Sequence, residues 1–526
     1  MSICVEVSNK LVLRGLDEKD VEIIEQDLTF SNPQYAKVKK YSRWNTTSVP
    51  KFLEYFKIYE EDGEMCAEVP IGYDIHNLYS EIGQIADYRR FNKVKKFPEF
   101  VLTLRDTQQE ALENYLDLNF SDFSLPHGSV QLPTGKGKTI LGLAISKRLS
   151  CRTLIIVHKD DLVTGWKKDI EKAFGGKADI GLIKAKSRKI GEHFTIATIQ
   201  TLNRLTEKEL YVLYDSFGLV IQDEMHHCPS TSFQLGNNFN CRFRLGLTAT
   251  PERTDGLEHI MKLFYGDFCY AYEVKEDDED ILQVKVIKRN LLTYFNPVVT
   301  KVGDVFRVKR KLEDPINFVR DNSKLKSNEC RISDIPYAKR PDILYSSIEY
   351  LSAIQYDTMS VVTKDIISEY EQGHSCIAFF SQKEEVEKYR DFLVLNGVNE
   401  SDIGLYYGNN KDCDSIIDKA ENNRKFITLA TYSKATEGTN VKQWEVGFLV
   451  SSINNGKNVE QAVGRIRRTK PDGEKHEIAK LYDYRYNNVY QLSRHGDTRN
   501  LRYKKLKFDV GHNTSKSLFS KGWSKN

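Results

Sequence analysis

The stretch SVQLPTGKGKTILGLAISKRL, residues 129–149, decides the expected fold of this 526-residue chain. It begins with a short apolar run, continues into a loop that contains Gly135 and Gly137, and ends in a helical apolar pattern over residues 139–149. The two glycines allow the loop to turn its backbone N–H groups toward an anion at the start of the helix. A strand, a glycine loop and a helix in this order predict a phosphate-binding loop rather than a plain turn.

The side chains of this loop fit a nucleoside triphosphate and its metal ion. Lys138 can neutralise the β- and γ-phosphate oxygens, and the hydroxyl of Thr139 can bind Mg²⁺. Leu132 departs from the strict pattern, which has a glycine at that position. The residues predicted to bind ATP in this loop are Pro133, Thr134, Gly135, Lys136, Gly137, Lys138 and Thr139.

Two adjacent acidic residues, Asp223 and Glu224, follow a second apolar run at residues 219–221. In an open α/β sheet, ligands bind at the carboxyl ends of the strands. Adjacent acids often lie in a solvated turn, but a position after an apolar strand and downstream of a phosphate loop favours catalysis. We predict that Asp223 binds Mg²⁺ and that Glu224 activates the attacking water.

Short apolar runs alternate with amphipathic stretches from about residue 100 onward, which is typical of helices layered on a parallel sheet. The predicted strands form two sets, residues 129–132, 153–157, 180–183, 195–198 and 219–221 in the first and residues 376–380, 403–406, 426–430 and 446–450 in the second. The predicted fold class is therefore α/β, with two doubly wound parallel-sheet domains and a small N-terminal α+β domain.

These patterns predict four segments. They are an N-terminal accessory domain at 1–100, a first sheet domain at 101–275, a second sheet domain at 276–484 with an inserted hairpin near 298–311, and a basic C-terminal tail at 485–526. An acidic run at residues 273–280 marks a candidate hinge between the two sheet domains. Basic residues in the first segment, such as Lys37 and Arg43, fit DNA binding and an ordinary surface equally well.

The predicted tail carries ten Lys or Arg residues against two Asp residues. Six aromatic residues are interleaved with these charges, Tyr486, Tyr490, Tyr503, Phe508, Phe519 and Trp523. Such a mixture fits a surface that binds a polyanion, although charged chain ends are often only solvated.

The composition is that of an ordinary globular protein, with 40% hydrophobic and 29% charged residues and a net charge of +3. The nine cysteines are scattered and never spaced as CxxC, which argues against a disulfide framework and against a zinc knuckle. The first residues lack the pattern of a secretory signal, and no run of about 18 apolar residues occurs. A cytoplasmic protein without a membrane segment is expected, in the host cytoplasm if the gene belongs to a phage.

Further motifs occur in a fixed order between residues 104 and 470, and together they resemble the motors of helicase superfamily 2, of the DExH kind. They are LRDTQ (104–108), VHK (157–159), ATIQTL (197–202), LTATP (247–251), AFFS (378–381), ATYS (430–433) and QAVGRIRR (461–468). The continuation ERTDG, residues 252–256, is similar to the XPB-like and phage UvsW-like branch. The resemblance implies two tandem RecA-like domains.

The resemblance also implies roles for individual residues. Those implied at the nucleotide are Arg105, Gln108, Gly438 and Asn440, with Gln108 near the base. Those implied at a nucleic-acid backbone are His158, Lys159, Thr198, Thr201, Ser381 and Thr431. Gln461, Arg465 and Arg468 are implied to act in catalysis, with the two arginines at the γ-phosphate. Asn440 stands where many relatives carry Asp.

The expected function is that of an ATP-dependent DNA helicase or translocase that uses ATP and Mg²⁺ and remodels branched DNA such as forks and recombination junctions. A monomer is expected. Two alternatives stay open at this point. One is an RNA-directed or transcription-coupled ATPase, because the motor motifs do not distinguish the 2′-OH of RNA. The other is the motor subunit of a larger restriction or defence complex.

Overall fold

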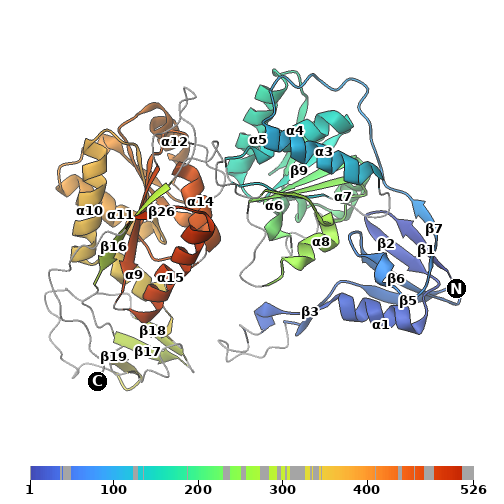
Figure 1. Ribbon diagram of the computed structural model, residues 1–526, viewed down its shortest axis with the longest axis horizontal. Helices are drawn as coiled ribbons and strands as arrows, with labels where there is room; N and C mark the ends of the chain where they lie inside the picture. The colour runs from blue at the N-terminus through green and yellow to red at the C-terminus, as the bar shows by residue number, and fades with distance from the viewer. Residues whose placement is uncertain are drawn as a thin grey trace. The chain divides into compact units, whose positions relative to one another are not determined.

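The structure is a computed structural model of the chain (Figure 1). It describes residues 2–35, 38, 49–121, 128–133, 135–185, 187–228, 237–249, 256–272, 284–292, 298–302, 305–308, 326–331, 335, 343–344, 346–408, 410–435, 441–454, 456–466, 479–487 and 489–511. The chain divides into two compact units, residues 1–273 and 274–526, and each unit is described by itself.

The first unit begins with a five-stranded sheet in the order β5-β6-β2-β1-β7. Its strands are β1 (Ile3–Val7), β2 (Lys10–Arg14), β5 (Lys57–Glu61), β6 (Glu64–Pro70) and β7 (Ile82–Asp87). Helix α1 (Glu18–Asp27) packs on this sheet through Ile24, and its N-terminus is capped by the side chain of Asp17. A separate ribbon is formed by β3 (Thr29–Ser31) and β4 (Phe52–Glu54). These elements confirm the mixed α and β character expected for the N-terminal part.

The N-terminal sheet is joined to the rest of the first unit through helix α8 (His259–Tyr265). The backbone N–H of Gly72 donates to the carbonyl oxygen of Leu263 at 2.8 Å. The Leu263 side chain packs on the apolar cluster of the N-terminal sheet. A Cβ atom at position 72 would lie 2.1 Å from the backbone oxygen of Lys262, so only glycine allows this approach.

We expect Gly72→Ala to lower the free energy of unfolding of the first unit by about 2 kcal/mol, because the added methyl group forces two backbone segments apart. Chemical denaturation followed by circular dichroism measures this change. Gly165→Ala is the matched control, since Gly165 lies in helix α5 (Asp160–Ala173) with open space around its Cα. That control should be neutral or stabilising by up to about 1 kcal/mol. Equal stability of the Gly72→Ala variant and the unsubstituted protein would show that the contact contributes little.

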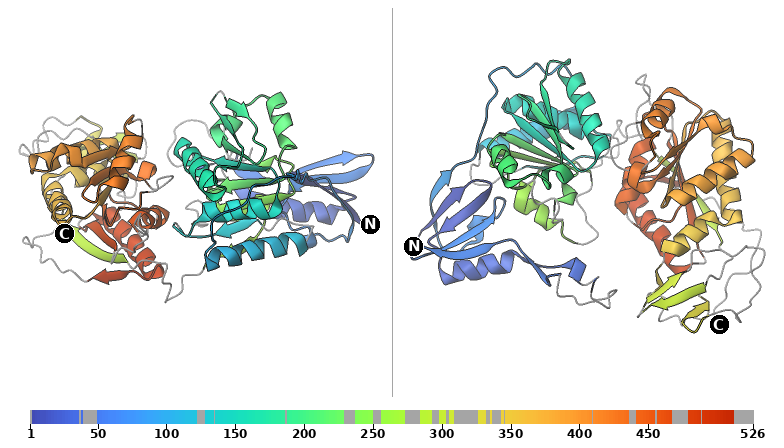
Figure 2. Two further views of the ribbon diagram at one scale, coloured as in Figure 1. Left: turned by 90° about the horizontal axis from the view of Figure 1, so that it is seen from above. Right: turned by 180° about the vertical axis from the view of Figure 1, so that it is seen from behind.

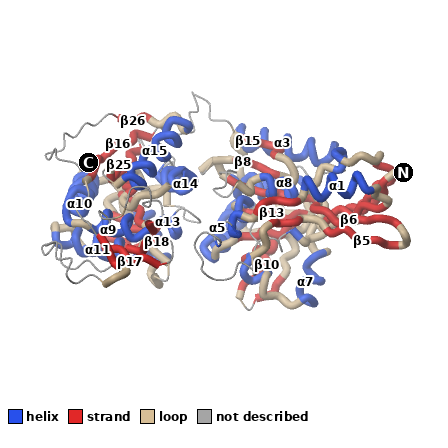
Figure 3. Tube along the Cα trace, turned by 90° about the horizontal axis from the view of Figure 1, so that it is seen from below, coloured by secondary structure: helices blue, strands red, loops and turns tan. Residues whose placement is uncertain are grey.

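The main sheet of the first unit has eight strands in the order β11-β10-β12-β9-β13-β14-β8-β15. Figure 3 labels β10, β13, β8 and β15 among them. They are β8 (Ser129–Gln131), β9 (Thr153–Val157), β10 (Ile180–Lys184), β11 (Ser187–Lys189), β12 (Phe194–Thr198), β13 (Leu219–Asp223), β14 (Phe243–Thr248) and β15 (Phe268–Ala271). Every neighbouring pair is parallel except β10–β11. The helices are α3 (Asp106–Ser121), α4 (Lys138–Leu149), α5, α6 (Ile199–Leu202) and α7 (Glu207–Tyr214). All five strands predicted for this domain are confirmed.

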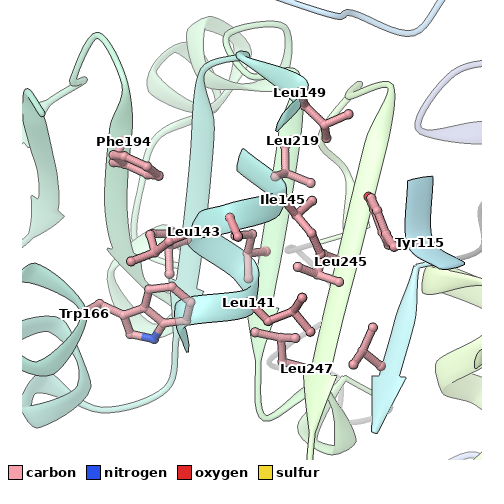
Figure 4. Packing of buried hydrophobic residues seen from close by; sticks show 14 of the residues in the cluster. Tyr115, Leu141, Leu143, Ile145, Leu149, Trp166, Phe194, Leu219, Leu245 and Leu247 are labelled. Atoms are coloured by element: carbon pink, nitrogen blue, oxygen red, sulfur yellow. The ribbon is translucent and has the colours of Figure 1, made fainter. Parts of the chain in front are cut away.

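Helix α4 is fixed to this sheet by a continuous apolar cluster (Figure 4). Leu141 and Ile145 of the helix belong to the same cluster as Leu245 and Leu247 of β14, and all four side chains are fully buried. Burying one such side chain is worth about 1.5–3 kcal/mol. The start of α4, where the phosphate-binding loop ends, is therefore anchored to the centre of the sheet.

The second unit is built on a seven-stranded sheet in the order β22-β23-β21-β24-β25-β16-β26, with every neighbouring pair parallel. Its strands are β16 (Val284–Leu291), β21 (Cys376–Phe380), β22 (Ile403–Tyr406), β23 (Ile427–Thr431), β24 (Val446–Leu449), β25 (Ala479–Tyr486) and β26 (Asp509–Gly511). Its helices are α9 (Ser346–Ile354), α10 (Tyr356–Glu371), α11 (Lys383–Leu395), α12 (Cys413–Asn422), α13 (Tyr432–Ala435), α14 (Gly456–Ile466) and α15 (Tyr490–Lys505). The four strands predicted here are confirmed.

Helices cover both faces of this second sheet (Figure 2). Along β21, Ala378 and Phe380 pack in one apolar cluster with residues of α9, α10 and α11. Ile377 and Phe379 point to the opposite face and pack in a second cluster with residues of α12, α14 and α15. Both units therefore contain an α/β parallel sheet, and the predicted tandem RecA-like fold is confirmed.

The hairpin predicted near residues 298–311 is present in the second unit. Strands β17 (Val298–Val302) and β18 (Val305–Val308) pair antiparallel. They form a small sheet with β19 (Glu329–Arg331) and β20 (Ile343–Leu344). The turn at 303–304 and the basic residues 309–311 lie outside the described residues, as does the acidic run at 273–280 that we interpreted as a hinge.

The prediction of a separate basic tail from residue 485 onward is wrong for the described part. Arg485 and Tyr486 end β25, α15 follows, and β26 pairs with β16 in the main sheet. Tyr486 and Tyr503 are fully buried, so these aromatic residues fill the core of the second unit instead of alternating with charges on a surface. Within the described residues, no helix is both long enough and apolar enough to span a bilayer.

Candidate nucleotide and nucleic-acid site

The candidate phosphate-binding loop connects β8 to α4 at the carboxyl end of the first sheet. Gly135 and Gly137 have φ angles of +87° and +76°, the left-handed conformation that favours glycine. Helix α4 begins after Gly137 without a side-chain cap, so its first N–H groups can serve an anion. The Nζ atom of Lys138 lies 3.3 Å from the carbonyl oxygen of Leu132, which holds the ammonium group against the loop.

Gln108 of α3 holds the shape of this loop. Its Nε2 donates to the carbonyl oxygens of Lys136 at 3.2 Å and Gly137 at 3.0 Å, and its Oε1 accepts from the backbone N–H of Arg105. A guanidinium nitrogen of Arg105 donates to the carbonyl oxygen of Gly135 at 3.1 Å. A Cβ atom at position 137 would lie 2.3 Å from Gln108 Nε2, so a larger residue there would displace this amide from the loop. The implied contact of Gln108 with the base stays a prediction.

We expect Gln108→Ala to weaken ATP binding about tenfold, because two loop carbonyl groups lose their donor and a deletion of this kind costs about 1–3 kcal/mol. Equilibrium titration with a fluorescent ATP analogue measures the affinity. The control is Gln109→Ala, since the neighbouring glutamine bonds Glu113 across an exposed helix surface. If both variants bind the analogue as tightly as the unsubstituted chain, Gln108 does not position the loop.

The two adjacent carboxylates lie at the carboxyl end of β13. Asp223 accepts from the indole N–H of Trp166 at 2.9 Å and from the backbone N–H of Glu224 at 3.0 Å. Burial raises the pKa of Asp223, the charge of Glu224 raises it further, and the Trp166 hydrogen bond and Lys138 act in the opposite direction. No sequence signal showed that Trp166 orients the acid.

Glu224 has a left-handed backbone, with φ of +51° and ψ of +54°. A non-glycine residue in this conformation costs roughly 1–2 kcal/mol. The chain turns sharply out of the strand at this residue, and its Oε2 lies 3.2 Å from Nδ1 of His226. The strain therefore sits at the residue that we predict to activate water, as is common at functional sites.

His226 connects the acidic pair to the end of β14. Its Nδ1 lies 3.2 Å from the hydroxyl oxygen of Thr248, the last residue of that strand. The ring of His227 lies 4.3 Å from the ring of His226 and 4.7 Å from the ring of His158, measured between centroids. The ends of β9, β13 and β14 are therefore in contact through three histidines.

The residues of this edge fit Mg²⁺ and ATP. Asp223 is 7% exposed and the half-buried carboxylate of Glu224 lies beside it, so a divalent cation would offset the repulsion between the two negative charges. Asp223 and Thr139 would hold the metal ion together with phosphate oxygens and water. Lys138 and the N–H groups at the start of α4 would hold the phosphates.

The residues of the first unit that we predicted to touch nucleic acid lie at or just after the ends of parallel strands, but several are buried. His158 is 7% exposed and Thr198 is 3% exposed. The hydroxyl groups of Thr198 and Thr201 bond each other at 2.8 Å, and Gln200 donates to the carbonyl oxygen of His158. Lys159 is half-buried at the start of α5. These internal contacts fix the conformation of the strand ends. The protein backbone N–H groups there and the side chain of Lys159 remain as candidates for a contact with a phosphate group.

In the second unit the predicted nucleic-acid residues lie at the ends of β21 and β23. Ser381 is exposed, and its backbone N–H donates to Glu385 at 2.8 Å and to the hydroxyl oxygen of Ser451 at 3.0 Å. Thr431 is 6% exposed, and its hydroxyl oxygen lies 3.5 Å from that of Ser433. Ser381 is therefore placed for a nucleic-acid contact more favourably than Thr431.

Gln461 and Arg465 lie four residues apart on α14, so they share one face of this helix. They are 1% and 6% exposed. Neither amide atom of Gln461 has a hydrogen-bond partner among the described residues, which is rare for a buried side chain. The predicted site residues Thr134, Gly438, Asn440 and Arg468 lie outside the described residues.

Residues 101–253 match the model of the family described as "Type III restriction enzyme, res subunit". The chain is 35% identical over 176 residues to the DNA 3'-5' translocase XPB2 of Sulfurisphaera tokodaii, a match that covers 33% of this chain and 37% of that protein. It is 25% identical over 335 residues to helicase D10 of Escherichia phage T5, covering 64% of this chain and 63% of the relative. A protein of Acanthamoeba polyphaga mimivirus, named as ATP-dependent RNA helicase L396, is 21% identical over 94% of this chain and 83% of its own length.

Among solved structures, a fragment of an HsdR subunit of a type I restriction enzyme from Vibrio vulnificus shares the fold, with a TM-score of 0.51 and 16% identity over 76% of this chain and 68% of that chain. The fold and the loop geometry define a P-loop protein with tandem RecA-like domains. By sequence the chain is similar to an XPB-type DNA translocase and to phage and viral helicases. It spans less than two thirds of the length of the XPB2 translocase and of the phage T5 helicase.

Proposed function

We propose that this protein is an ATP-driven DNA translocase or helicase that remodels branched DNA, such as forks and recombination junctions. The observation that carries the proposal is the pair of carboxylates at the end of β13, the buried Asp223 and the half-buried Glu224, with the charge of Lys138 acting on Asp223. A metal-binding acid, a water-activating acid and a phosphate-binding lysine on one sheet edge are what hydrolysis of a nucleoside triphosphate requires.

The proposed hydrolysis uses each group for a separate task. Lys138 and the α4 N-terminus hold the phosphates, Asp223 orients the metal ion, and Glu224 accepts a proton from the attacking water. Gln461, Arg465 and Arg468 of the second unit would complete the site around the γ-phosphate. An arginine supplied in this way is worth about 10³-fold or more in rate. Hydrolysis would then be coupled to the relative movement of the two units.

The nucleic-acid part of the proposal is supported by the relatives and by the strand ends. The relative with the highest identity quoted above is named as a DNA translocase, which favours DNA. Residues that follow β12, β21 and β23 lie at the ligand-binding edges of their sheets. Contacts between a protein and the phosphate backbone of a nucleic acid are independent of base sequence and are weakened by salt. Branched DNA as the preferred substrate rests on the resemblance of residues 247–256 to the branch of helicases that includes phage UvsW.

The test compares ATP-dependent remodelling of forks, four-way junctions, linear duplexes and RNA–DNA hybrids of equal length. We expect ATP hydrolysis to be stimulated more by DNA than by RNA, and forks and junctions to be remodelled faster than linear duplexes. ATP hydrolysis without remodelling of any branched substrate would contradict the proposed role in remodelling branched DNA, while the proposed ATPase activity would stand. If neither DNA nor RNA stimulates ATP hydrolysis, the entire proposed function is contradicted.

A second candidate is the motor subunit of a restriction complex. It is favoured by the match of residues 101–253 to a restriction-enzyme family and by the fold shared with an HsdR subunit. Purification from the native cell distinguishes the two, because a motor subunit would leave the column in a stable complex with a nuclease. An RNA helicase is the third candidate, favoured by the name of the mimivirus relative, and the RNA arm of the test above addresses it.

A further inference from the structure

The short segment between β24 and α14, residues 450–453, is held by hydrogen bonds from several elements of the second unit. The hydroxyl of Tyr432 donates to the carbonyl oxygen of Ser451 at 3.0 Å, and the hydroxyl of Tyr486 donates to that of Val450 at 2.9 Å. The hydroxyl of Ser451 donates to Glu385 at 2.9 Å and accepts from the backbone N–H of Ser381. The segment therefore contacts the ends of β21, β23 and β25 just before α14 begins.

Arg499 of α15 completes this set of contacts. Its guanidinium donates to the carbonyl oxygen of Ile453 at 3.0 Å and to that of Tyr484 at 3.1 Å, and it lies 3.5 Å from the hydroxyl of Ser452. Its side chain is 1% exposed. A buried arginine that donates hydrogen bonds to several carbonyl groups fixes their relative positions, because the N–H groups of its planar guanidinium point in fixed directions.

The guanidinium of Arg499 is itself held in place by Asp483 of β25. Both Nε and a terminal nitrogen of Arg499 lie 2.8 Å from Oδ1 of Asp483. Nε of Arg485 donates to Oδ2 of the same carboxylate at 3.1 Å, and Arg485 also bonds Gly496 and Asn500 of α15. A fully buried carboxylate between two arginines is costly to disturb, so α15 is fixed to the sheet at one position.

A second ion pair joins α15 directly to α14. Arg502 pairs with Glu460, and the two side chains are 14% and 12% exposed. Glu460 immediately precedes Gln461 on α14, and the aliphatic part of Arg502 packs beside Gly456 at the start of that helix. The two helices lie side by side in the structure (Figure 1). Two arginines of α15 therefore hold the start of α14 in place. Arg499 bonds the segment that precedes the helix, and Arg502 pairs with Glu460 of the helix itself.

We propose that Arg499 and Arg502 are positioning residues for ATP hydrolysis, which set the place and direction of α14 and hence of Gln461 and Arg465. This inference rests on the proposed function of α14 at the γ-phosphate. The two arginines touch no nucleotide themselves. Because groups at the γ-phosphate act mainly in the transition state, a shifted α14 lowers kcat and leaves KM for ATP nearly unchanged.

The test uses Arg502→Gln, Glu460→Gln and the charge-swapped double variant Arg502→Glu/Glu460→Arg in the full chain. ATP hydrolysis is measured at saturating DNA, and rates are divided by the concentration of nucleotide-binding sites, so unfolded molecules do not count. We expect each single variant to lower kcat about tenfold with KM changed less than about twofold, and the swapped pair to recover most of kcat. Asp497→Asn, a charge change on the exposed side of α15, should leave both constants unchanged.

Arg499→Lys provides the second variant, because an ammonium group can pair with Asp483 but cannot reach the carbonyl groups of Ile453 and Tyr484 in the same geometry. We expect kcat to fall at an unchanged number of nucleotide-binding sites. Unchanged kcat in both Arg499→Lys and Arg502→Gln would overturn the proposal. A loss of ATP affinity, seen as a rise in KM as large as the fall in kcat, would overturn it as well. The proposed function has its own control: it fails if the unsubstituted chain does not hydrolyse ATP or if Glu224→Gln hydrolyses it normally.

Discussion

Changing Glu224 to Gln is expected to lower the rate of ATP turnover about 10³-fold while leaving ATP binding nearly unchanged. The amide keeps the size of the carboxylate and one acceptor oxygen, but it cannot accept a proton from water. Because Glu224 leaves the strand in a left-handed turn beside His226, its position is set by the backbone and should survive the substitution. Loss of the second negative charge also removes the main charge that raises the pKa of Asp223, so metal binding is retained.

Turnover is measured by phosphate release and binding by titration with a fluorescent ATP analogue, both at saturating DNA. Glu207→Gln is the matched control, because this acid lies at the exposed start of α7 in the same unit. A Glu224→Gln variant that hydrolyses ATP within a few-fold of the normal rate would remove Glu224 from the mechanism.

Changing Lys138 to Ala is expected to weaken ATP binding about 100-fold or more, since a charge-assisted hydrogen bond to phosphate is lost in a partly buried site and such bonds contribute about 1.5–3 kcal/mol each. The side chain lies against the loop at Leu132, so its removal also loosens the loop. The same titration measures the affinity. Arg148→Ala, at the exposed far end of α4, controls for the loss of one positive charge. Equal affinities in the two variants would exclude Lys138 as a phosphate ligand.

Much of the fold could be predicted from the sequence, because both main sheets are parallel and buried on both faces. Strands in such sheets are short continuous apolar runs, and β9, β13, β21 and β23 are fully buried along their length. The loop before α4 was predictable for a similar reason, since glycines, a lysine and a helix start occur within a few residues.

Strand β16 could not be predicted in this way. Its residues alternate between buried and partly exposed, with Lys285, Lys288 and Arg289 among them, and its partners are far away in the sequence. The basic residues of α15 led to the wrong prediction of a basic tail over residues 485–511, because their partners in the fold cannot be recognised from the sequence. Arg485 and Arg499 meet Asp483 only after the sheet has formed, so a sequence pattern cannot distinguish them from solvated residues.

The site was predictable at the level of residue types and less so at the level of contacts. Gln108, Lys138, Asp223 and Glu224 do lie on one edge of the first unit, although their roles remain predictions. The buried positions of His158 and Thr198 were not foreseen, since threonine and histidine occur on surfaces and in cores alike.

The pairing of β16 with β25 and β26 has a consequence for biosynthesis. Strand β16, at residues 284–291, has to wait for partners that are made much later, at residues 479–486 and 509–511. The first unit is complete once residue 273 has left the ribosome, so it can fold while synthesis continues. The unpaired edges of β16 stay exposed for the translation of nearly 200 further residues. Slow codons or a lack of chaperones late in the message should therefore reduce the yield of soluble chain more than the same disturbance early in it.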